Sequence, residues 1–162
     1  MTTLDLLHTE MESPVGPLHL FANDKGLTAL YMNIQRYEMP TGVEGSNAIL
    51  EQTKQELTEY FEGNRRDFSV PLDPQGTEFR KSVWMELMNI PFGKTITYGE
   101  LAKRLGDPLL TRAVGTANGA NPISIIIPCH RVVGANGHLT GYGGGIERKR
   151  WLLDHEAEDQ LF

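Results

Sequence analysis

A change in the hydrophobic pattern at residues 73–76, Asp-Pro-Gln-Gly, constrains the fold more than any other feature of this chain. Before it, apolar runs at 18–21 and 27–32 flank the turn-forming residues 23–26, which predicts a β-hairpin. After it, apolar residues recur at a helical period. The sequence therefore predicts an α/β (α+β) protein with a small domain over 1–75 and a helical domain over 76–162.

The rest of the N-terminal part completes a small antiparallel sheet covered by one helix. Apolar positions over 46–61 repeat near 3.6 residues, and Gly63 follows as a stop, so we expect a helix there. Residues 68–72 read as an edge strand or extended segment, because Pro71 has no N–H to donate. Residues 34–45 contain two glycines and a proline and read as a loop.

Helix start and stop signals punctuate the C-terminal part. Thr77 can cap a helix that ends before Pro91, and a second short helix over 98–105 is ended by Gly106. Asp107-Pro108 restarts a third helix, which runs to about Asn118 or Gly119. Two short helices joined by a tight turn with glycine predict a winged-helix-like helix-turn-helix. A last amphipathic helix is expected over 145–156.

In the first and the last of these helices, the apolar positions also predict which side chains point inward. The expected core positions are Phe79, Val83, Leu87 and Met88 in the first helix, and Ile146, Trp151, Leu152 and Leu153 in the last.

The charge of the chain is divided unevenly. The formal net charge is −6, which argues against a nucleic-acid binder when taken for the whole chain. Residues 1–75, however, carry five Lys and Arg against twelve Asp and Glu, whereas residues 76–156 carry ten against seven. The helix-turn-helix part is thus mildly basic, which permits DNA binding through few phosphate contacts and with a shallow salt dependence.

The chain has one cysteine, Cys129. It can form no intramolecular disulfide and no cysteine-rich zinc site. The N-terminus lacks a secretory signal, and the apolar run 123–127 is too short to cross a bilayer. We expect a soluble, reduced, cytoplasmic protein that makes no contact with membranes.

Cys129 is followed directly by His130, at the end of the apolar run that Pro128 interrupts. A thiol of pKa about 8.5 is only slightly ionised at neutral pH, so a nucleophilic cysteine needs partners that favour the thiolate. Neighbouring residues of an extended chain point to opposite sides, so a bridging water between Cys129 and His130 is as consistent with the sequence as direct contact. A carboxylate behind His130 would orient it as a base, and Glu156 is one candidate that spacing alone does not select.

Structural interpretations compete with each of these. A lone cysteine is more often a small buried hydrophobe than a nucleophile, and Arg131 is better explained by a salt bridge or a helix-end contact. The small residues of the third helix suit tight helix packing, Tyr98 suits a core, and residues 141–145 suit a flexible turn.

Linked motifs shift this balance. Pro128-Cys-His-Arg-Val, with Asn121-Pro before it and Gly141-Tyr-Gly-Gly-Gly after it, resembles the O6-alkylguanine-DNA alkyltransferases. The segments starting at Ile90 (IPFGKTITYGELA), Arg112 (RAVGTANGANP) and Arg148 (RKRWLLDHE) match at the spacing of that family. The resemblance is strong over about 77–156 and loose in the N-terminal half.

This resemblance implies a role for each matched residue. Cys129 would accept the alkyl group, His130 would take the thiol proton through a water, and Glu156 would orient His130. Tyr98 would donate a proton or hydrogen bond to the departing guanine, and Asn121 would brace the segment before the active site. No cofactor would be needed, and each molecule would react once, as a suicide enzyme.

The resemblance also implies how DNA is held. The helix that carries Arg112 would enter the minor groove, and Arg112 would fill the space of a flipped-out nucleotide. The residues expected at the DNA are Arg112, Thr111, Ala113, Asn118 and Arg131, and those expected to line the base pocket are Tyr142, Gly143 and Gly144. The partner would be double-stranded DNA that contains O6-alkylguanine, and O4-alkylthymine is a second expected substrate for a monomeric protein.

The chain departs from the family pattern at several places. Some members bind zinc through cysteines and histidines of the N-terminal half, but that half has no cysteine here, so no metal is expected. Gly143 stands where others have Ser or Ala, and Ala120 where a basic residue is frequent. The related alkyltransferase-like proteins lack the acceptor cysteine, whereas this chain has Cys129.

Two functions of other classes compete with this interpretation. A non-catalytic DNA-binding regulator would use the helix-turn-helix but would not need Cys129. A Cys-His hydrolase would turn over repeatedly. A phosphate-binding loop at 93–95 is excluded because the glycine required five residues before Gly93 is Met88.

Overall fold

The structure of the protein is a computed structural model that describes residues 6–32, 40, 42–139 and 145–158. It separates into two compact units, Met1–Gln75 and Gly76–Phe162. No helix in the described part of the chain is long and apolar enough to cross a membrane. The two units are considered in turn.

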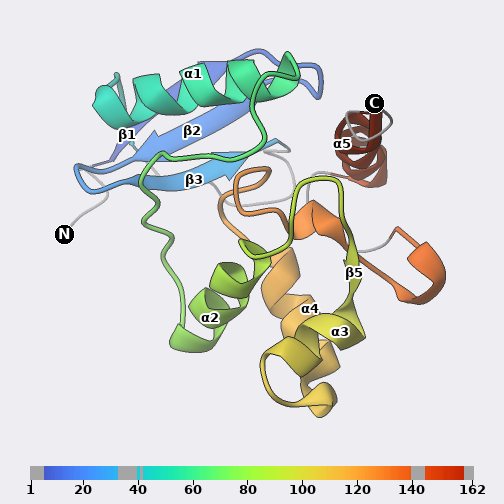
Figure 1. Ribbon diagram of the computed structural model, residues 1–162. Coiled ribbons are helices and arrows are strands. Elements are labelled where there is room, and N and C mark those ends of the chain that lie inside the picture. Colours follow the sequence, from blue (N-terminus) through green and yellow to red (C-terminus); the bar gives the residue numbers. More distant parts are fainter. Residues whose placement is uncertain (1–5, 33–39, 41, 140–144, 159–162) are drawn as a thin grey trace. The chain divides into compact units, whose positions relative to one another are not determined.

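The first unit is built on a four-stranded sheet in the order β3-β2-β1-β4 (Figure 1). The strands are β1 (Leu7–Met11), β2 (Leu18–Ala22), β3 (Leu27–Tyr31) and β4 (Val43–Glu44). The predicted hairpin is confirmed as β2–β3, and its turn is held by Asn23 Oδ1, which accepts from the N–H groups of Lys25 and Gly26. β1 and the two-residue β4 were not predicted, because neither carries a continuous apolar run.

The predicted helix of this unit is α1 (Ala48–Phe61), and the Asn47 side chain caps it by accepting from Leu50 N–H. Figure 1 shows α1 along one face of the sheet. Leu50, Leu57 and Tyr60 are fully buried. The face they form follows from the helical repeat of apolar residues in the sequence.

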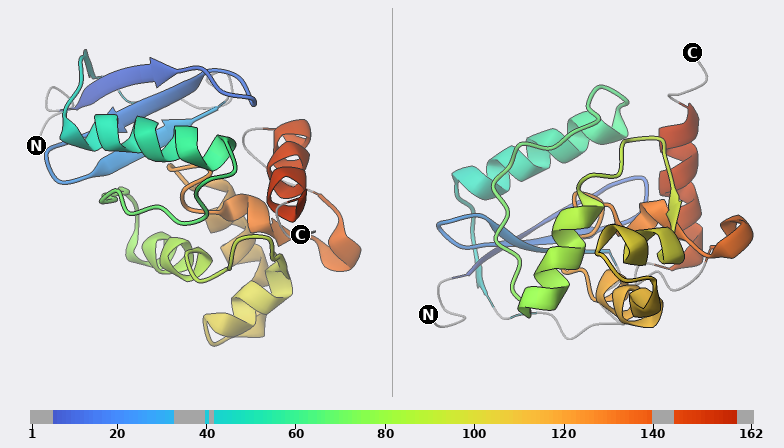
Figure 2. Two further views of the ribbon diagram at one scale, coloured as in Figure 1. Left: turned by 45° about the horizontal axis from the view of Figure 1, so that its top comes forward. Right: turned by 60° about the horizontal axis from the view of Figure 1, so that its bottom comes forward.

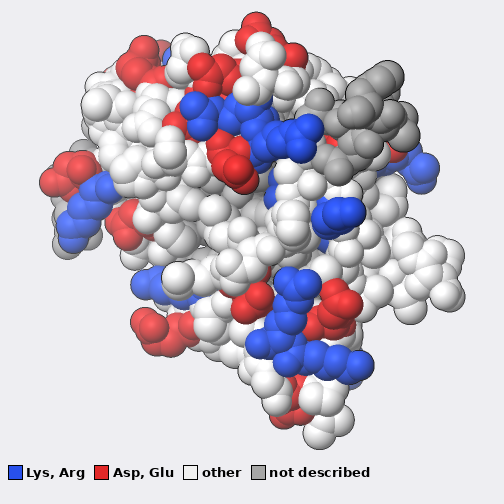
Figure 3. Space-filling view, viewed as in Figure 1, with Lys and Arg blue, Asp and Glu red and all other residues white. Residues whose placement is uncertain are grey.

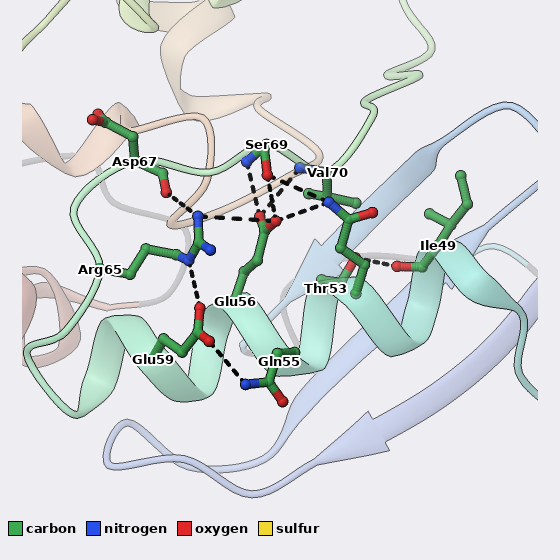
Figure 4. A network of polar contacts seen from close by, with 10 residues as sticks. Ile49, Thr53, Gln55, Glu56, Glu59, Arg65, Asp67, Ser69 and Val70 are labelled. Carbon is green, nitrogen blue, oxygen red and sulfur yellow. Dashed lines mark hydrogen bonds and ion pairs between the residues drawn. The ribbon is translucent and has the colours of Figure 1, made fainter.

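A buried carboxylate fastens the chain that follows α1 (Figure 4). Glu56 accepts from the backbone N–H of Ser69 at 2.9 Å, from Ser69 Oγ at 2.7 Å and from the N–H of Val70 at 3.1 Å. Burial opposes ionisation, but these bonds and one from Gln52 outweigh it and lower the pKa of Glu56. Arg65 donates to Glu59 at 2.7 Å, which anchors the start of the same segment.

The second unit is mainly helical. Its elements are α2 (Glu78–Leu87), β5 (Ile96–Thr97), α3 (Tyr98–Arg104), η2 (Pro108–Leu110), α4 (Thr111–Gly119), η3 (Cys129–Arg131), β6 (Val132–Val133), η4 (Ala135–Gly137) and α5 (Ile146–Glu158). Trp84 of α2 donates from Nε1 to the carbonyl of Ala117 at 2.8 Å, a buried bond that joins α2 to α4. Figure 2 shows α2, α3 and α4 close to one another in both views.

The predicted helix boundaries mostly agree with the structure. Thr77 caps α2, and Gly106 follows α3 with φ +99°, a conformation that favours glycine. The third helix differs at its start, because Asp107 caps a 3₁₀ turn, η2, and the α-helix begins only at Thr111. Proline at the first position and the short Asp cap suit either form of turn, so the sequence did not distinguish them.

Some of the predicted core positions were wrong. Phe79, Met88 and Ile146 are each more than a third exposed, whereas Trp84 and Lys149 are almost fully buried in their place. The error came from weighting apolar type over position on the helix, since both short helices turn a face of mixed character toward the core.

Candidate functional site

Two tight turns present Cys129. Ile125 has φ +71°, and Ile126 N–H donates to the carbonyl of Ser124 at 2.8 Å across it. Pro128 (φ −81°, ψ 62°) is spanned in the same way, by a 2.8 Å bond from Cys129 N–H to the carbonyl of Ile127. A β-branched residue at positive φ is strained, so the surrounding structure must hold this segment in place.

Asn121 supplies part of that support. Its Nδ2 donates to the carbonyl of Ile127 at 2.8 Å, and its Oδ1 accepts from Ile123 N–H at 3.0 Å. The side chain is buried, and these two hydrogen bonds close the loop from 121 to 127 onto itself. This is the contact pattern that a bracing residue would make.

A two-stranded parallel sheet sets Tyr98 and Cys129 on neighbouring segments. β5 pairs with β6 through Ile96↔Val132 and Thr97↔Val133. Tyr98 follows β5 directly as the first residue of α3, and η3 with Cys129 precedes β6 directly. The Tyr98 ring lies against α4, where a Cβ at Gly115 would be 3.7 Å from Tyr98 Cδ1.

His130 and Glu156 meet in the interior of the unit. His130 Nε2 lies 2.8 Å from Glu156 Oε2, and both side chains are almost completely buried. Arg131 donates from Nε to the other oxygen, Oε1, at 2.8 Å and from Nη2 to Oε2 at 3.1 Å. Its Nη1 donates to the carbonyl of Ile90 at 2.7 Å. One carboxylate thus holds two neighbouring basic side chains.

The electrostatics of this group fix its charges. Burial opposes ionisation of Glu156, but the contacts with His130 and Arg131 outweigh it and lower the pKa of the carboxyl well below its usual range. Burial lowers the pKa of His130 despite the nearby carboxylate, so the imidazole is neutral at pH 7. A neutral ring that donates from Nε2 to Glu156 leaves Nδ1 as an acceptor, and Nδ1 hydrogen-bonds to no described residue.

Cys129 itself is buried, and burial raises the pKa of its thiol. The Asn121 side chain and the positive charge of Lys149 oppose that rise. Lys149 is fully buried and donates from Nζ to the carbonyl of Val132 at 2.7 Å. Burial lowers the pKa of Lys149, and a thiolate at Cys129 would counter this. Burial therefore favours the protonated thiol of Cys129, and only the contacts with Asn121 and Lys149 favour the thiolate.

The helix-turn-helix exposes one face of its second helix. Arg112, Ala113 and Thr116 of α4 are exposed, and Leu109 in the preceding turn is 90% exposed. Thr111 is half-buried and donates to the carbonyl of Pro108. Figure 3 shows Lys and Arg interspersed with Asp and Glu on the face it displays. The exposed side chains of α4 are thus one arginine and two small residues, Ala113 and Thr116.

Two residues expected at the DNA are placed elsewhere. Arg131 is buried in the ion pair with Glu156, as the salt-bridge interpretation predicted, and this position does not support the expected DNA contact. Asn118 is also buried and donates to the carbonyl of Cys129 at 3.4 Å. Both positions have one cause, because α4 and η3 turn these side chains toward the core. The predicted pocket residues Tyr142, Gly143 and Gly144 lie outside the described residues.

Sequence reasoning missed Lys149. It stands between Arg148 and Arg150, and such a basic run is usually a solvated surface. The signal that could have found it is its spacing, because Lys149, Leu152 and Glu156 fall on one face of α5.

Comparisons with known proteins agree along the whole described chain. A family model described as the ribonuclease-like domain of 6-O-methylguanine DNA methyltransferase matches residues 6–74. A second model, described as the DNA binding domain of the same protein, matches residues 78–158.

Individual relatives give the same result. The chain is 47% identical over 150 residues to the methylated-DNA–protein-cysteine methyltransferase of Methanosarcina acetivorans, covering 90% of this chain and 95% of the relative. It is 49% identical over 152 residues to that of Mycobacterium bovis, covering 90% and 89%.

Solved structures resemble the fold closely. The crystal structure of the Mycobacterium tuberculosis O6-methylguanine methyltransferase has a TM-score of 0.87 at 44% identity, covering 95% of this chain and 94% of the other. A crystal structure of the Mycobacterium tuberculosis protein in complex with DNA has a TM-score of 0.87 at 45% identity, covering 94% of each chain. On these matches the chain belongs to the 6-O-methylguanine DNA methyltransferase family.

Proposed function

We propose that this protein repairs DNA by transferring the alkyl group of O6-alkylguanine to Cys129, once per molecule. The observation that carries the proposal is the buried Cys129 followed directly by His130, whose Nε2 lies 2.8 Å from Glu156 Oε2 in the interior of the unit. The relatives that match 90% of the chain are methylated-DNA–protein-cysteine methyltransferases.

The reaction balances without a cofactor. The Cys129 sulfur forms a bond to the alkyl carbon, the bond from that carbon to O6 breaks, and the electron pair goes to the guanine. The thiol proton leaves through a water to His130 Nδ1, the nitrogen that Glu156 does not occupy. Tyr98 donates a proton or hydrogen bond to the departing base. The base takes up one proton in all, which balances the proton lost by the thiol, and so it leaves as ordinary guanine in DNA.

The thioether that forms explains why each molecule reacts once. A thioether at Cys129 is not readily hydrolysed, so no step regenerates the thiol. The burial that raises the thiol pKa protects the resting cysteine from other alkylating agents. Because the reaction requires a reduced thiol, we place the protein in a reducing compartment such as the cytoplasm.

Access to the buried Cys129 requires that the damaged nucleotide leave the duplex, which costs a few kcal/mol of stacking and pairing. The exposed Arg112 on the small-residue face of α4 suits insertion into the vacated space. Arg112→Ala should slow repair of duplex DNA more than transfer from the free base O6-methylguanine. An equal effect on both substrates would refute this role, and Arg80→Ala, at an exposed arginine of α2, is the control.

The decisive experiment is intact mass before and after exposure to duplex DNA with one O6-methylguanine. The expected result is a gain of one methylene group per chain, mapped to Cys129 by peptide analysis, with an end point of one lesion repaired per molecule. Many products per molecule would favour a Cys-His hydrolase, and no mass change would favour a non-catalytic DNA-binding protein.

Cys129→Ser should bind the same DNA and gain no mass, because a hydroxyl is a far weaker nucleophile than a thiolate. If the variant still removes the methyl group, the acceptor is misassigned. O4-alkylthymine, a monomeric state and a preference for double strands are further parts of the proposal, tested by the same end point on each DNA and by sedimentation.

A further inference from the structure

Two histidines and a glutamate converge on one face of the sheet in the first unit. His8 and Glu10 are two residues apart on β1 and so point to the same side, and His19 of β2 pairs directly with Glu10. One ligand atom from each of the three lies within 4.8 Å of the other two. Because β1 and β2 form one continuous ladder, the backbone holds these positions together.

The two histidines have unused nitrogen atoms that are buried. His8 Nε2 and His19 Nδ1 are shielded from solvent and make no hydrogen bond to any described residue. The His19 side chain is only 10% exposed, and its Nδ1 lies 3.3 Å from Glu10 Oε1 without the alignment of a hydrogen bond. A buried polar atom that makes no hydrogen bond costs free energy, so these two histidine nitrogens call for an explanation.

The rings around this site are held in place. The His8 ring stacks on Phe21, with centroids 4.5 Å apart and planes within 7°. The His19 ring lies 6.0 Å from the His8 ring. Glu10 is 59% exposed, so the group is open to solvent on the carboxylate side.

From this geometry we propose that His8, Glu10 and His19 bind a divalent transition-metal ion, with Zn²⁺ as the ion to test. Two imidazoles and a carboxylate are ligands that Zn²⁺ accepts at about 2.0–2.2 Å, with water completing a tetrahedron. Ligands at that distance stand about 3.4 Å apart, so the side chains have only to draw in from their present separations. The sequence analysis expected no metal because this half has no cysteine. The proposed site needs no cysteine, so that argument does not apply to it.

The site is separate from the proposed alkyl-transfer chemistry. Its ligands all belong to the first unit, whereas Cys129, His130 and Glu156 belong to the second. A bound ion would join β1 to β2 by side chains as well as by backbone and would stabilise the first unit by mass action.

The test is Zn²⁺ titration of the full chain after chelator treatment, with stoichiometry by native mass spectrometry and affinity by chelator competition. The expected result is one Zn²⁺ per chain. Glu10→Gln, at an exposed side chain whose change should not disturb folding, should weaken binding by roughly tenfold or more, since even outer partners of a metal affect affinity by 10–100-fold. The matched control is Glu12→Gln, an exposed glutamate beyond the end of β1, which should bind as the unaltered protein does.

A second variant and a spectroscopic readout complete the test. His8→Phe keeps a ring on Phe21 but removes a ligand, so it should lose the high-affinity site. In imidazole NMR spectra Zn²⁺ should shift the His8 and His19 rings and leave the exposed His138 unchanged.

Three results would overturn the proposal: no Zn²⁺ bound, binding that Glu10→Gln and His8→Phe leave unaltered, or binding that Cys129→Ser abolishes. The first would mean that Glu10 and His19 form only an ion pair. The third would place the ion at the cysteine instead.

Discussion

At the scale of single residues, Glu156 organises more of the site than any other side chain. It accepts from His130 on one oxygen and from Arg131 on both, in the interior of the second unit. His130 and Arg131 are neighbours in η3, whereas Glu156 belongs to α5, so this one carboxylate joins the two elements. The same residue therefore orients the proposed base and neutralises a buried cation.

Replacing Glu156 tests both consequences. Glu156→Gln leaves the Arg131 guanidinium buried without a counterion, so the free energy of unfolding of the second unit should fall by about 3 kcal/mol at pH 7. Both tryptophans, Trp84 and Trp151, belong to this unit, so denaturant unfolding followed by tryptophan fluorescence reports it. Alkyl transfer should slow as well, because the His130 tautomer is no longer fixed.

The control is Glu147→Gln, an exposed position in the first turn of the same helix, with an expected change of about 0.5 kcal/mol or less. A loss as large for this variant would mean that the effect is one of helix charge and not of the buried pair.

The pH dependence of stability belongs to the same scale. The folded pKa of Glu156 is lowered, so the stability it contributes is complete above its ordinary value of 4.5 and is lost as pH falls below it. The folded pKa of His130 is lowered too, so protonation of the unfolded chain already costs stability below about 6.5. The difference in unfolding free energy between the unaltered protein and Glu156→Gln should shrink from pH 5 to pH 3, and a difference that grows would contradict this assignment.

At the scale of elements, the α3–α4 turn depends on one backbone conformation. Gly106 has φ +99° just after the C-cap of α3, and a Cβ there would meet nothing within 4 Å. Gly106→Ala should therefore lower the unfolding free energy by about 1 kcal/mol through backbone strain alone.

Gly99 provides the matched comparison. It lies in the first turn of α3, where a Cβ would be 3.9 Å from Thr97 Oγ1, an ordinary contact. Gly99→Ala should raise stability by about 0.5 kcal/mol, because alanine restricts the unfolded chain more than glycine does. If the two variants change stability in the same direction in thermal or denaturant unfolding, the turn is not controlled by φ at Gly106.

At the scale of the whole molecule, the charge is distributed in a way that limits DNA affinity. Residues 1–75 are strongly acidic, and the second unit has only a small excess of basic residues, two of which, Arg131 and Lys149, are buried. With about three phosphate contacts, the slope of log K against log salt should be about −3, since each contact contributes about −0.9. Fluorescence anisotropy over a salt series measures this, and a slope twice as steep would reveal a basic surface that the charge distribution does not suggest.

Much of this protein is determined by its sequence alone. The β2–β3 hairpin, α1, α2 and α3 follow from hydrophobic period, capping residues and glycine stops, all of which act between near neighbours in the chain. The acceptor role of Cys129 was predicted in another way, from linked motifs that resemble those of a known family, because a lone cysteine by itself is more often a buried hydrophobe.

Only the tertiary structure decided what each side chain of the site faces. It joined Glu156 to His130 across 26 positions of sequence, turned Arg131 and Asn118 inward and buried Lys149 within a basic run. It also set His8, Glu10 and His19 together, through a β1 strand that the hydrophobic pattern did not reveal. The physical reason is the same in each case: burial and pairing depend on which elements pack or pair with one another, and spacing along one chain does not carry that information.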